Sequence, residues 1–263
     1  MKTTHRIEER VIQRAMESYP TIEELVVGST PVVSFGNPGP AKMITVGINP
    51  SSSEFQVPGK SKNLLPSGKK RLVDLESLGI ENPKSLNREQ AIQTIEGCYD
   101  YFDTKNHNPY MTWFNHLNDN INKHFGLNYL DGSAAHLDLV QWATDPVWGG
   151  IASEAIRGEL LKSDAEFLRY QVASKKYDIV FMNGREVKNQ LESTGIVEVT
   201  VTKATSYQTK TKKTKPLEFF KGTTSNGSLA LGWSKPFPGH YISSESLPKV
   251  VQELHQFMDE QTK

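Results

Sequence analysis

The feature that most constrains the fold is a buried strand that ends at a glycine and passes directly into a helix. Residues 176–192, KYDIVFMNGREVKNQLE, run from a continuous apolar strand, Ile179–Met182, through Asn183-Gly184 into a helical pattern. Strands that are apolar along their whole length belong to parallel sheets covered by helices on both faces. This order therefore predicts a doubly wound, three-layer α/β/α fold with a central, mostly parallel sheet.

Further strands and helices are predicted on both sides of this segment. Apolar runs predict strands at 42–46, 134–143, 196–202 and 228–232. Helical spacing predicts helices at 6–18, 88–103, 109–125, 151–173 and 247–258. A chain of 263 residues is long enough for one sizeable core, so we expect a single domain over residues 1–263. Residues 203–227 are low in apolar content, and such a segment can stay disordered without a partner.

Composition excludes several classes of protein. Thirty basic residues balance thirty acidic ones, so a polyanion has to be bound by local patches rather than by a global field. The single cysteine, Cys98, permits neither an internal disulfide nor an iron–sulfur cluster, and the seven scattered histidines predict no metal site and no cofactor. No apolar run approaches the ~20 residues that span a bilayer. We expect a cytoplasmic monomer that does not enter a membrane.

Polar residues follow four of the predicted strands. In doubly wound sheets, ligands bind just beyond the carboxyl ends of the strands. The candidate segments are 47–53, 138–145, 183–185 and 234–241.

The first of these segments, GINPS, fixes an asparagine side chain. Gly47 permits a turn or a close ligand approach, and Pro50 forces Asn49 out of helical geometry. A carboxamide held in this way can accept a hydrogen bond from a water molecule without the desolvation penalty of a charge. The alternative is that Asn49 only forms a turn.

The run VGINPS, residues 46–51, resembles the first motif of the uracil-DNA glycosylase superfamily, in particular its mismatch-specific thymine/uracil branch. The order of elements is similar as well, through HLDLVQWATDP, DIVFMNGREV and LALGWSKPFPGHY, so that the resemblance covers most of residues 30–258. It implies a uracil-DNA glycosylase-like fold and a monofunctional DNA glycosylase without cofactor or metal. Such an enzyme binds double-stranded DNA, flips one nucleotide outward and hydrolyses its N-glycosidic bond.

The resemblance also implies roles for individual residues. Asn49 would position the attacking water, and Gly47, Ile48 and Asn183 would contact the flipped base. Ser51 and Ser234 would contact DNA.

The closing motif departs from the family pattern. The family has a histidine followed by Pro-Ser at a strand end, whereas this strand ends at Trp233-Ser234 and His240 follows six positions after Ser234. His240 is either the residue that stabilises charge on the departing base or an exposed loop histidine. Phe237 lies between two prolines and is either a wedge that enters a base step or a core phenylalanine.

Asp138 aligns with the position where many superfamily members carry an asparagine that reads uracil. Uracil offers an acceptor at O4 and a donor at N3, whereas cytosine offers a donor at N4 and an acceptor at N3. A carboxylate accepts from N4, and if its pKa is raised in a closed pocket, the protonated group also donates to N3. Asp138 therefore favours a cytosine-type edge over uracil and thymine, unless it is a structural acid at the strand end.

Aromatic residues near the first motif are candidates for stacking on the flipped base. Phe55 is the nearest, and Tyr110 and Trp113 are further candidates. Trp113 also lies in a helical apolar stripe, which is typical of core residues.

Two basic clusters, residues 60–71 and 203–215, each contain five basic residues and no acidic one. Phosphate contacts need such patches, although a lysine run is also typical of a solvated loop. The lysines predicted to bind DNA are Lys60, Lys62, Lys210, Lys212 and Lys213.

The leading hypothesis is a glycosylase that excises a modified or mismatched pyrimidine, with a modest preference for a modified cytosine such as those of phage DNA. Some superfamily members act in defence rather than repair. One alternative is a uracil or thymine-mismatch repair glycosylase. Another is a noncatalytic nucleic-acid-binding module, which the absent His-Pro-Ser pattern favours. A small-molecule or nucleotide hydrolase on the same kind of sheet is the third, but the chain has no Gly-rich phosphate loop or G-x-S-x-G turn.

Overall fold

The computed structural model describes residues 7–60, 62–81, 84–103, 109–236 and 242–260. The chain divides into two compact units, each assembled from distant segments. Unit 1 comprises Met1–Gly39, Ile48–Tyr110 and His136–Leu168, and unit 2 comprises Pro40–Gly47, Met111–Ala135 and Arg169–Lys263. The single domain expected over residues 1–263 stays a prediction, because this division into units does not test it.

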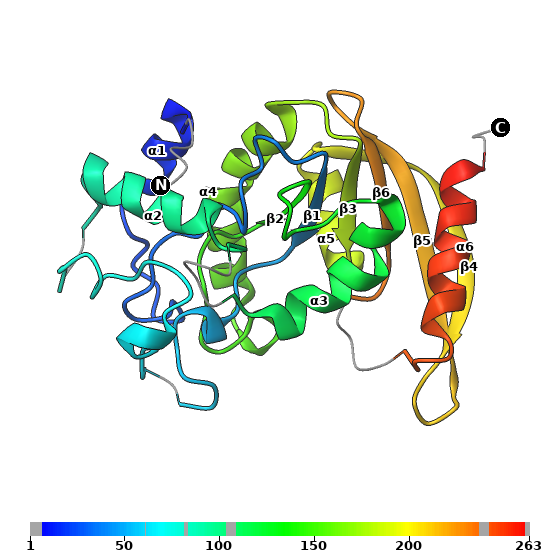
Figure 1. Cartoon of the computed structure of the whole chain (residues 1–263), viewed down its shortest axis with the longest axis horizontal. Coiled ribbons are helices and arrows are strands. Elements are labelled where there is room, and N and C mark those ends of the chain that lie inside the picture. Colours follow the sequence, from blue (N-terminus) through cyan, green and yellow to red (C-terminus); the bar gives the residue numbers. More distant parts are fainter. Residues whose placement is uncertain (1–6, 61, 82–83, 104–108, 237–241, 261–263) are drawn as a thin grey trace. The chain divides into compact units, whose positions relative to one another are not determined.

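A six-stranded sheet is the centre of the fold, in the order β2-β1-β3-β6-β5-β4 (Figure 1). β1 pairs in parallel with β3, and β3 with β6, whereas β5 is antiparallel to both β6 and β4. The strands are β1 Met43–Gly47, β2 Ala134–Asp138, β3 Ile179–Asn183, β4 Val197–Gln208, β5 Thr214–Thr224 and β6 Leu229–Trp233. The predicted α/β fold with a mostly parallel central sheet flanked by helices is confirmed.

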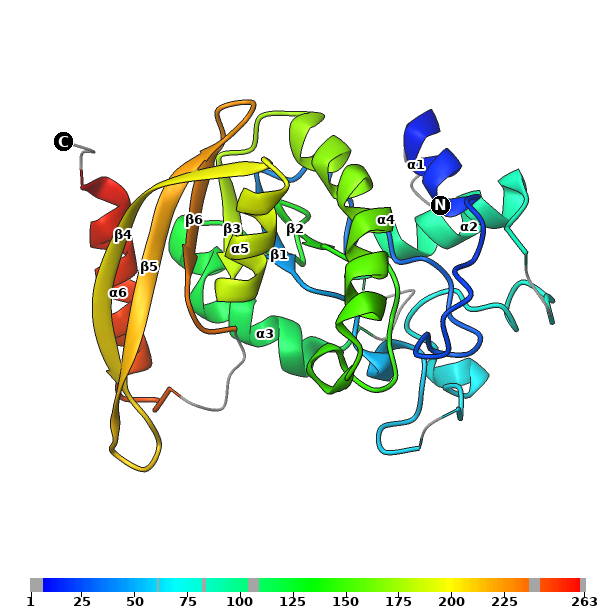
Figure 2. The same cartoon turned by 180° about the vertical axis from the view of Figure 1, so that it is seen from behind.

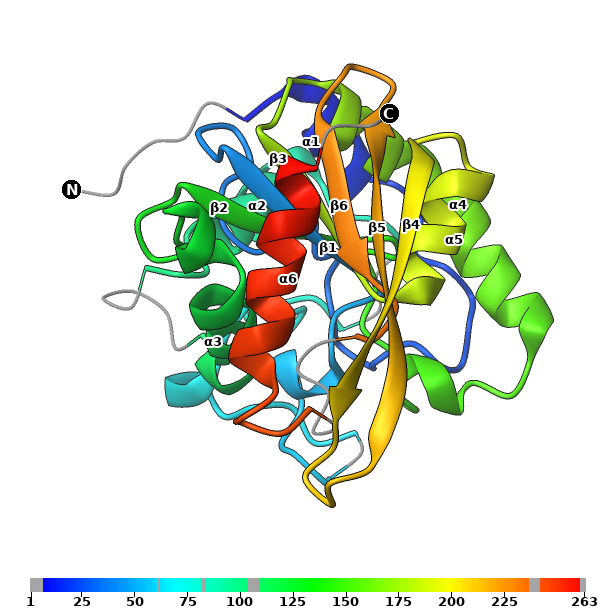
Figure 3. The ribbon, with the colours of Figure 1, turned by 90° about the vertical axis from the view of Figure 1, so that its right-hand side faces the viewer.

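In unit 2, helices cover both faces of the sheet. α5 (Arg185–Ser193) contacts β3 and β4, and α6 (Leu247–Asp259) contacts β4 and β5. Figures 2 and 3 show these two helices on opposite faces. The α6 face toward the sheet is apolar, and Phe257 stacks on Phe219 of β5 with ring centroids 5.9 Å apart. α3 (Met111–Asn120) contacts α6 and is followed by the short η3 (Asn122–Phe125).

The expectation that residues 203–227 can stay disordered is wrong. β4 and β5 form a long antiparallel hairpin that pairs from Val197–Thr224 to Gln208–Thr214, with a register shift between Val199 and Val201 (Figure 3). Threonine and valine favour strands, and an antiparallel sheet can leave one face to solvent. Low apolar content therefore did not indicate disorder, because alternate positions such as Leu217 and Phe219 are buried.

Unit 1 is mostly helices and loops. It contains α1 (Glu9–Ala15), α2 (Arg88–Tyr99), most of α4 (Glu154–Ala173) and the short η1 (Ser52–Glu54), η2 (Ser67–Lys69) and η4 (Trp148–Gly150). A capping box between Asn87 and Gln90 starts α2. Val140, Trp142 and Leu160 form a buried apolar cluster. The strand predicted at 134–143 ends at Asp138, and the residues after it form part of the candidate site.

Replacing Gly222 by alanine tests the hairpin register. A Cβ atom at Gly222 would lie 1.9 Å from the carbonyl oxygen of Glu198, beside the register shift. We expect Gly222→Ala to lower the free energy of unfolding by about 1–3 kcal/mol in urea denaturation, because the backbones have to move apart. Gly158→Ala is the control, because Gly158 is an exposed position of α4 and a Cβ atom there would meet nothing within 4 Å. Equal stability of the two variants would contradict the register.

Candidate active site

Asn49 follows β1 directly and has a fixed carboxamide. Its Nδ2 donates to the carbonyl oxygens of Pro50 (3.1 Å) and Trp142 (3.3 Å) and to Oγ1 of Thr144 (3.0 Å). Two of these acceptors are carbonyl groups, so the nitrogen has to face them. The side chain is half-buried, and its Oδ1 accepts no hydrogen bond from the described residues. The amide is therefore clamped through its nitrogen, which leaves one oxygen for an outside donor.

The backbone around Asn49 is fixed to the same segment. The carbonyl oxygen of Ile48 accepts from the N–H of Val140 at 2.8 Å, and Ser51 forms a parallel bridge with Thr144. The Ser51 hydroxyl caps η1 by accepting from the N–H of Ser53. Residues 48–51 and 140–144 therefore hold each other in register beyond the sheet.

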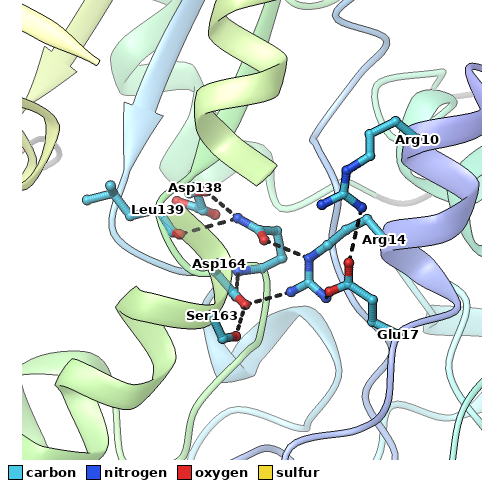
Figure 4. A network of polar contacts seen from close by, with 8 residues as sticks. Arg10, Arg14, Glu17, Asp138, Leu139, Ser163 and Asp164 are labelled. Atoms are coloured by element: carbon cyan, nitrogen blue, oxygen red, sulfur yellow. Dashed lines mark hydrogen bonds and ion pairs between the residues drawn. The ribbon is translucent and has the colours of Figure 1, made fainter. Parts of the chain in front are cut away.

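A buried polar network that includes Arg14 and Asp164 also fixes residues 138–141 (Figure 4). The Gln141 side chain donates to the carbonyl oxygens of Asp138 (2.9 Å) and Leu139 (3.3 Å) and accepts from Nε of Arg14 (3.1 Å). Asp164 accepts from the backbone N–H of Gln141 and from Arg14, both at 2.6 Å. Burial raises the pKa of Asp164, and the Arg14 guanidinium opposes this shift. Arg14 and Asp164 thus compensate each other's charge while they fix the chain that carries Asp138.

Asp138 is the last residue of β2 and is only 5% exposed. Its Oδ1 lies 3.2 Å from Nε2 of His136. Its Oδ2 is buried and has no hydrogen-bond partner among the described residues. A buried acceptor without a donor is unfavourable, so a ligand that supplies a donor at this point gains binding energy.

Glu54, at the end of η1, is a second buried acid and is 3% exposed. The Tyr101 hydroxyl donates to its Oε2 at 2.6 Å and accepts from the backbone N–H of Tyr110 at 2.8 Å. Burial is the main cause that raises the pKa of Glu54 to about 7, the charge of Asp138 raises it further, and Tyr101 and Arg71 act in the opposite direction. At neutral pH this carboxyl group is therefore close to half protonated.

Arg71 is a cationic residue whose charge acts on Glu54. Its Nη1 donates to the carbonyl oxygen of Ser53 at 2.8 Å, and its guanidinium lies over the Tyr110 ring, 4.5 Å from the centroid. Its Nε is buried without a partner among the described residues. Arg71 thus links η1 to Tyr110.

Three residues of this site, Glu54, Tyr101 and Arg71, were missed by sequence reasoning as site residues. Glu54 carried a signal, because an acid stands directly after the serines of the first motif in SSSEF. Tyr101 lies 47 positions further along the chain, and no local pattern links it to Glu54.

The structure divides the predicted site residues between the two units. Unit 1 contains Ile48, Asn49, Ser51, Phe55, Lys60, Lys62, Tyr110 and Asp138. Unit 2 contains Gly47, Trp113, Asn183, Lys210, Lys212, Lys213 and Ser234. Phe237 and His240 lie outside the described residues.

Several of these residues already have partners within the protein. Asn183 accepts from Nε1 of Trp233 at 3.1 Å, and the Ser234 hydroxyl accepts from the N–H of Glu218 at 2.9 Å. Phe55 is 2% exposed, so its ring is closed off from solvent. In the first basic cluster, Lys70 is paired with Asp74 and Glu76, whereas Lys60 and Lys62 are exposed.

The described part of the chain contains no group of three His, Cys, Asp or Glu side chains that could hold a metal ion. No helix among these residues is long and apolar enough to cross a membrane. No protein-family model matches the chain, and no curated protein matches it.

Removing the Asp164 carboxylate tests the buried network. Asp164→Ala leaves the Arg14 guanidinium buried without its partner, so we expect a loss of about 3–5 kcal/mol in the free energy of unfolding, measured by urea denaturation. Asp119→Ala breaks the exposed pair with Lys123 and is the control, with an expected change below about 1 kcal/mol. Similar losses in both variants would show that the buried pair contributes no more than a surface one.

Proposed function

We propose that this protein is a monofunctional DNA glycosylase with a uracil-DNA glycosylase-like fold, which flips a modified or mismatched pyrimidine out of the duplex and hydrolyses its N-glycosidic bond. The clamped carboxamide of Asn49 is the observation that carries this proposal. Three protein acceptors hold its nitrogen, and its oxygen remains available beyond the carboxyl end of β1. Ligands of such sheets bind at this end.

The neutrality of the amide fits a particular order of bond changes. An amide orients a water molecule but does not take its proton at neutral pH. Such a group is sufficient if the bond from C1′ to the base breaks first, the base leaves with the electron pair, and the sugar becomes cation-like. Water then attacks C1′ and loses its proton to solvent. The contribution of Asn49 is to hold the water in line with C1′.

Asp138 supports a cytosine-type substrate. Its unpartnered Oδ2 can accept from the exocyclic amino group of cytosine, whereas the O4 atom of uracil or thymine is itself an acceptor and would meet a carboxylate. A substituent at C5 leaves this edge unchanged. We therefore favour a modified cytosine, such as those that replace ordinary cytosine in some phage DNA, and a defence role follows from that substrate.

The tip of the β4–β5 hairpin is the proposed phosphate-contacting surface. Lys210, Lys212 and Lys213 are all exposed there, and the turn is closed by the N–H of Thr209 donating to the carbonyl oxygen of Lys213. This turn gathers three lysines at one hairpin tip, where their charges can contact the phosphate backbone.

An excision assay tests the activity. The protein is incubated with duplexes that contain uracil, a thymine mismatch, 5-hydroxymethylcytosine or its glucosylated form, and abasic sites are then cleaved with alkali. We expect strand breaks at a modified cytosine, and a rate about 100-fold lower or more in Asn49→Ala, because the water is no longer oriented. Asn189→Ala, on exposed α5, is the control. Binding without breaks on every duplex would instead support a noncatalytic DNA-binding module.

Salt dependence of DNA binding tests the hairpin tip. A triple alanine variant at Lys210, Lys212 and Lys213 is expected to bind duplex DNA more weakly. If each lysine neutralises one phosphate, the slope of log affinity against log salt falls in magnitude by about 0.9 per lysine. A triple variant at the exposed Lys42, Lys123 and Lys176 removes the same charge from unit 2 and serves as the control. Equal slopes in the two variants would exclude the tip from the interface.

A further inference from the structure

We propose that Glu54 is a specificity-determining residue that acts with Asp138: its protonated carboxyl group donates a hydrogen bond to N3 of a cytosine-type base, while Asp138 accepts one from the N4 amino group. This inference rests on the proposed glycosylase function and names the groups that would read the base.

Glu54 is held rigidly, one short helical turn after Asn49. The Ser51 hydroxyl caps η1, and Arg71 binds the carbonyl oxygen of Ser53, the residue before Glu54. The side chain itself is fixed by the 2.6 Å hydrogen bond from Tyr101. Because the side chain is already fixed, it loses little conformational entropy when a ligand binds.

The hydrogen bonds of Glu54 leave one donor unused. Tyr101 donates its hydroxyl proton to Oε2 and also accepts from Tyr110, so the proton of the neutral acid belongs on Oε1. Within the described part of the chain, the only hydrogen bond to the Glu54 carboxyl group is the one from Tyr101 to Oε2. The neutral acid therefore has an O–H donor at Oε1 that Tyr101 does not use.

Asp138 supplies the complementary acceptor. Its Oδ2 is buried and unpartnered in the described structure, while Oδ1 faces His136. The charge of Asp138 raises the pKa of Glu54 and so favours the neutral acid there.

The ionisable groups that act on Glu54 come from several segments. Arg71 and the Tyr101 hydroxyl favour the carboxylate, whereas burial and the charge of Asp138 favour the neutral acid, and together they raise its pKa to about 7. His136 lies behind Asp138, with its Nε2 against Oδ1. The donor on Glu54 is therefore present below about pH 7 and is lost as the pH rises above that value.

A donor on Glu54 and an acceptor on Asp138 would together match the edge of cytosine, which offers an acceptor at N3 and a donor at N4. They mismatch uracil and thymine, which offer a donor at N3 and an acceptor at O4. Cytosines that differ only at C5 keep the matching edge. The pair thus predicts selection for the cytosine edge together with tolerance of its 5-substituents.

The test is a pH profile of excision under single-turnover conditions. Duplexes containing 5-hydroxymethylcytosine or uracil are compared between pH 5.5 and 8.5 for the unaltered protein, Glu54→Gln and Glu54→Ala, with Glu159→Gln on exposed α4 as the control. We expect excision of 5-hydroxymethylcytosine to fall about tenfold per pH unit above pH 7 in the unaltered protein and the control, as one proton is lost. Glu54→Gln keeps an N–H donor, so its rate stays within about tenfold at pH 6 and no longer falls above pH 7, whereas Glu54→Ala is slower at every pH.

Two results would overturn the inference. One is an unchanged pH profile in Glu54→Gln, which would give Glu54 a structural role only. The other is excision of uracil as fast as of 5-hydroxymethylcytosine; in that case the glycosylase proposal stands and the base-reading assignment fails.

If no duplex is cleaved at all, the proposed function fails, and binding decides the inference separately. Tighter binding at pH 6 of the 5-hydroxymethylcytosine duplex than of the uracil duplex, lost in Glu54→Ala and kept in Glu54→Gln, supports the reading pair. Equal binding of the two duplexes overturns it. Thermal unfolding of each variant shows that the comparison is made on folded protein.

Discussion

The backbone that leaves β2 has to satisfy its polar groups without the sheet, and the candidate site depends on how it does so. After Asp138, side chains take over the role of a neighbouring strand: Asn49 binds the carbonyl oxygen of Trp142, and Gln141 binds those of Asp138 and Leu139. Buried backbone groups almost always find such partners. The same contacts that satisfy this backbone also orient the Asn49 carboxamide and place Asp138, so stability and the proposed chemistry share one set of hydrogen bonds.

Three buried acids in unit 1 illustrate the difference between a structural and a functional charge. Asp164 has an ion pair with Arg14 at 2.6 Å and further donors on both oxygens, as a buried carboxylate requires. Burial raises the pKa of both Asp164 and Glu54, but Asp138 has an oxygen without a donor and the Glu54 carboxyl group accepts a single hydrogen bond, from Tyr101. Incomplete satisfaction and a perturbed pKa in one cluster are typical of binding and catalytic sites. This contrast supports the assignment of Asp138 and Glu54, rather than Asp164, to the base.

Sequence reasoning reached the elements whose signals are local. The apolar run of β3 and its glycine gave the α/β class, and Gly47 to Pro50 marked a constrained asparagine at a strand end. β5 was missed because polar threonines and lysines hide its alternation. Residues 139–143 were assigned to a strand because they are mostly apolar. The pairs Glu54–Tyr101 and Arg14–Asp164 join positions 47 and 150 residues apart, and only the folded chain brings them together.

The central claim is that the free oxygen of the clamped Asn49 amide presents a water molecule to the sugar of a flipped nucleotide. A crystal structure of the protein with a duplex that carries a 2′-fluoroarabino analogue of 5-hydroxymethylcytidine, which resists cleavage, tests it directly. The account predicts an outward-turned base and a water molecule within hydrogen-bond distance of Asn49 Oδ1, in line with C1′. A nucleotide that stays stacked in the duplex, or a flipped sugar with no water between C1′ and Asn49, would contradict it.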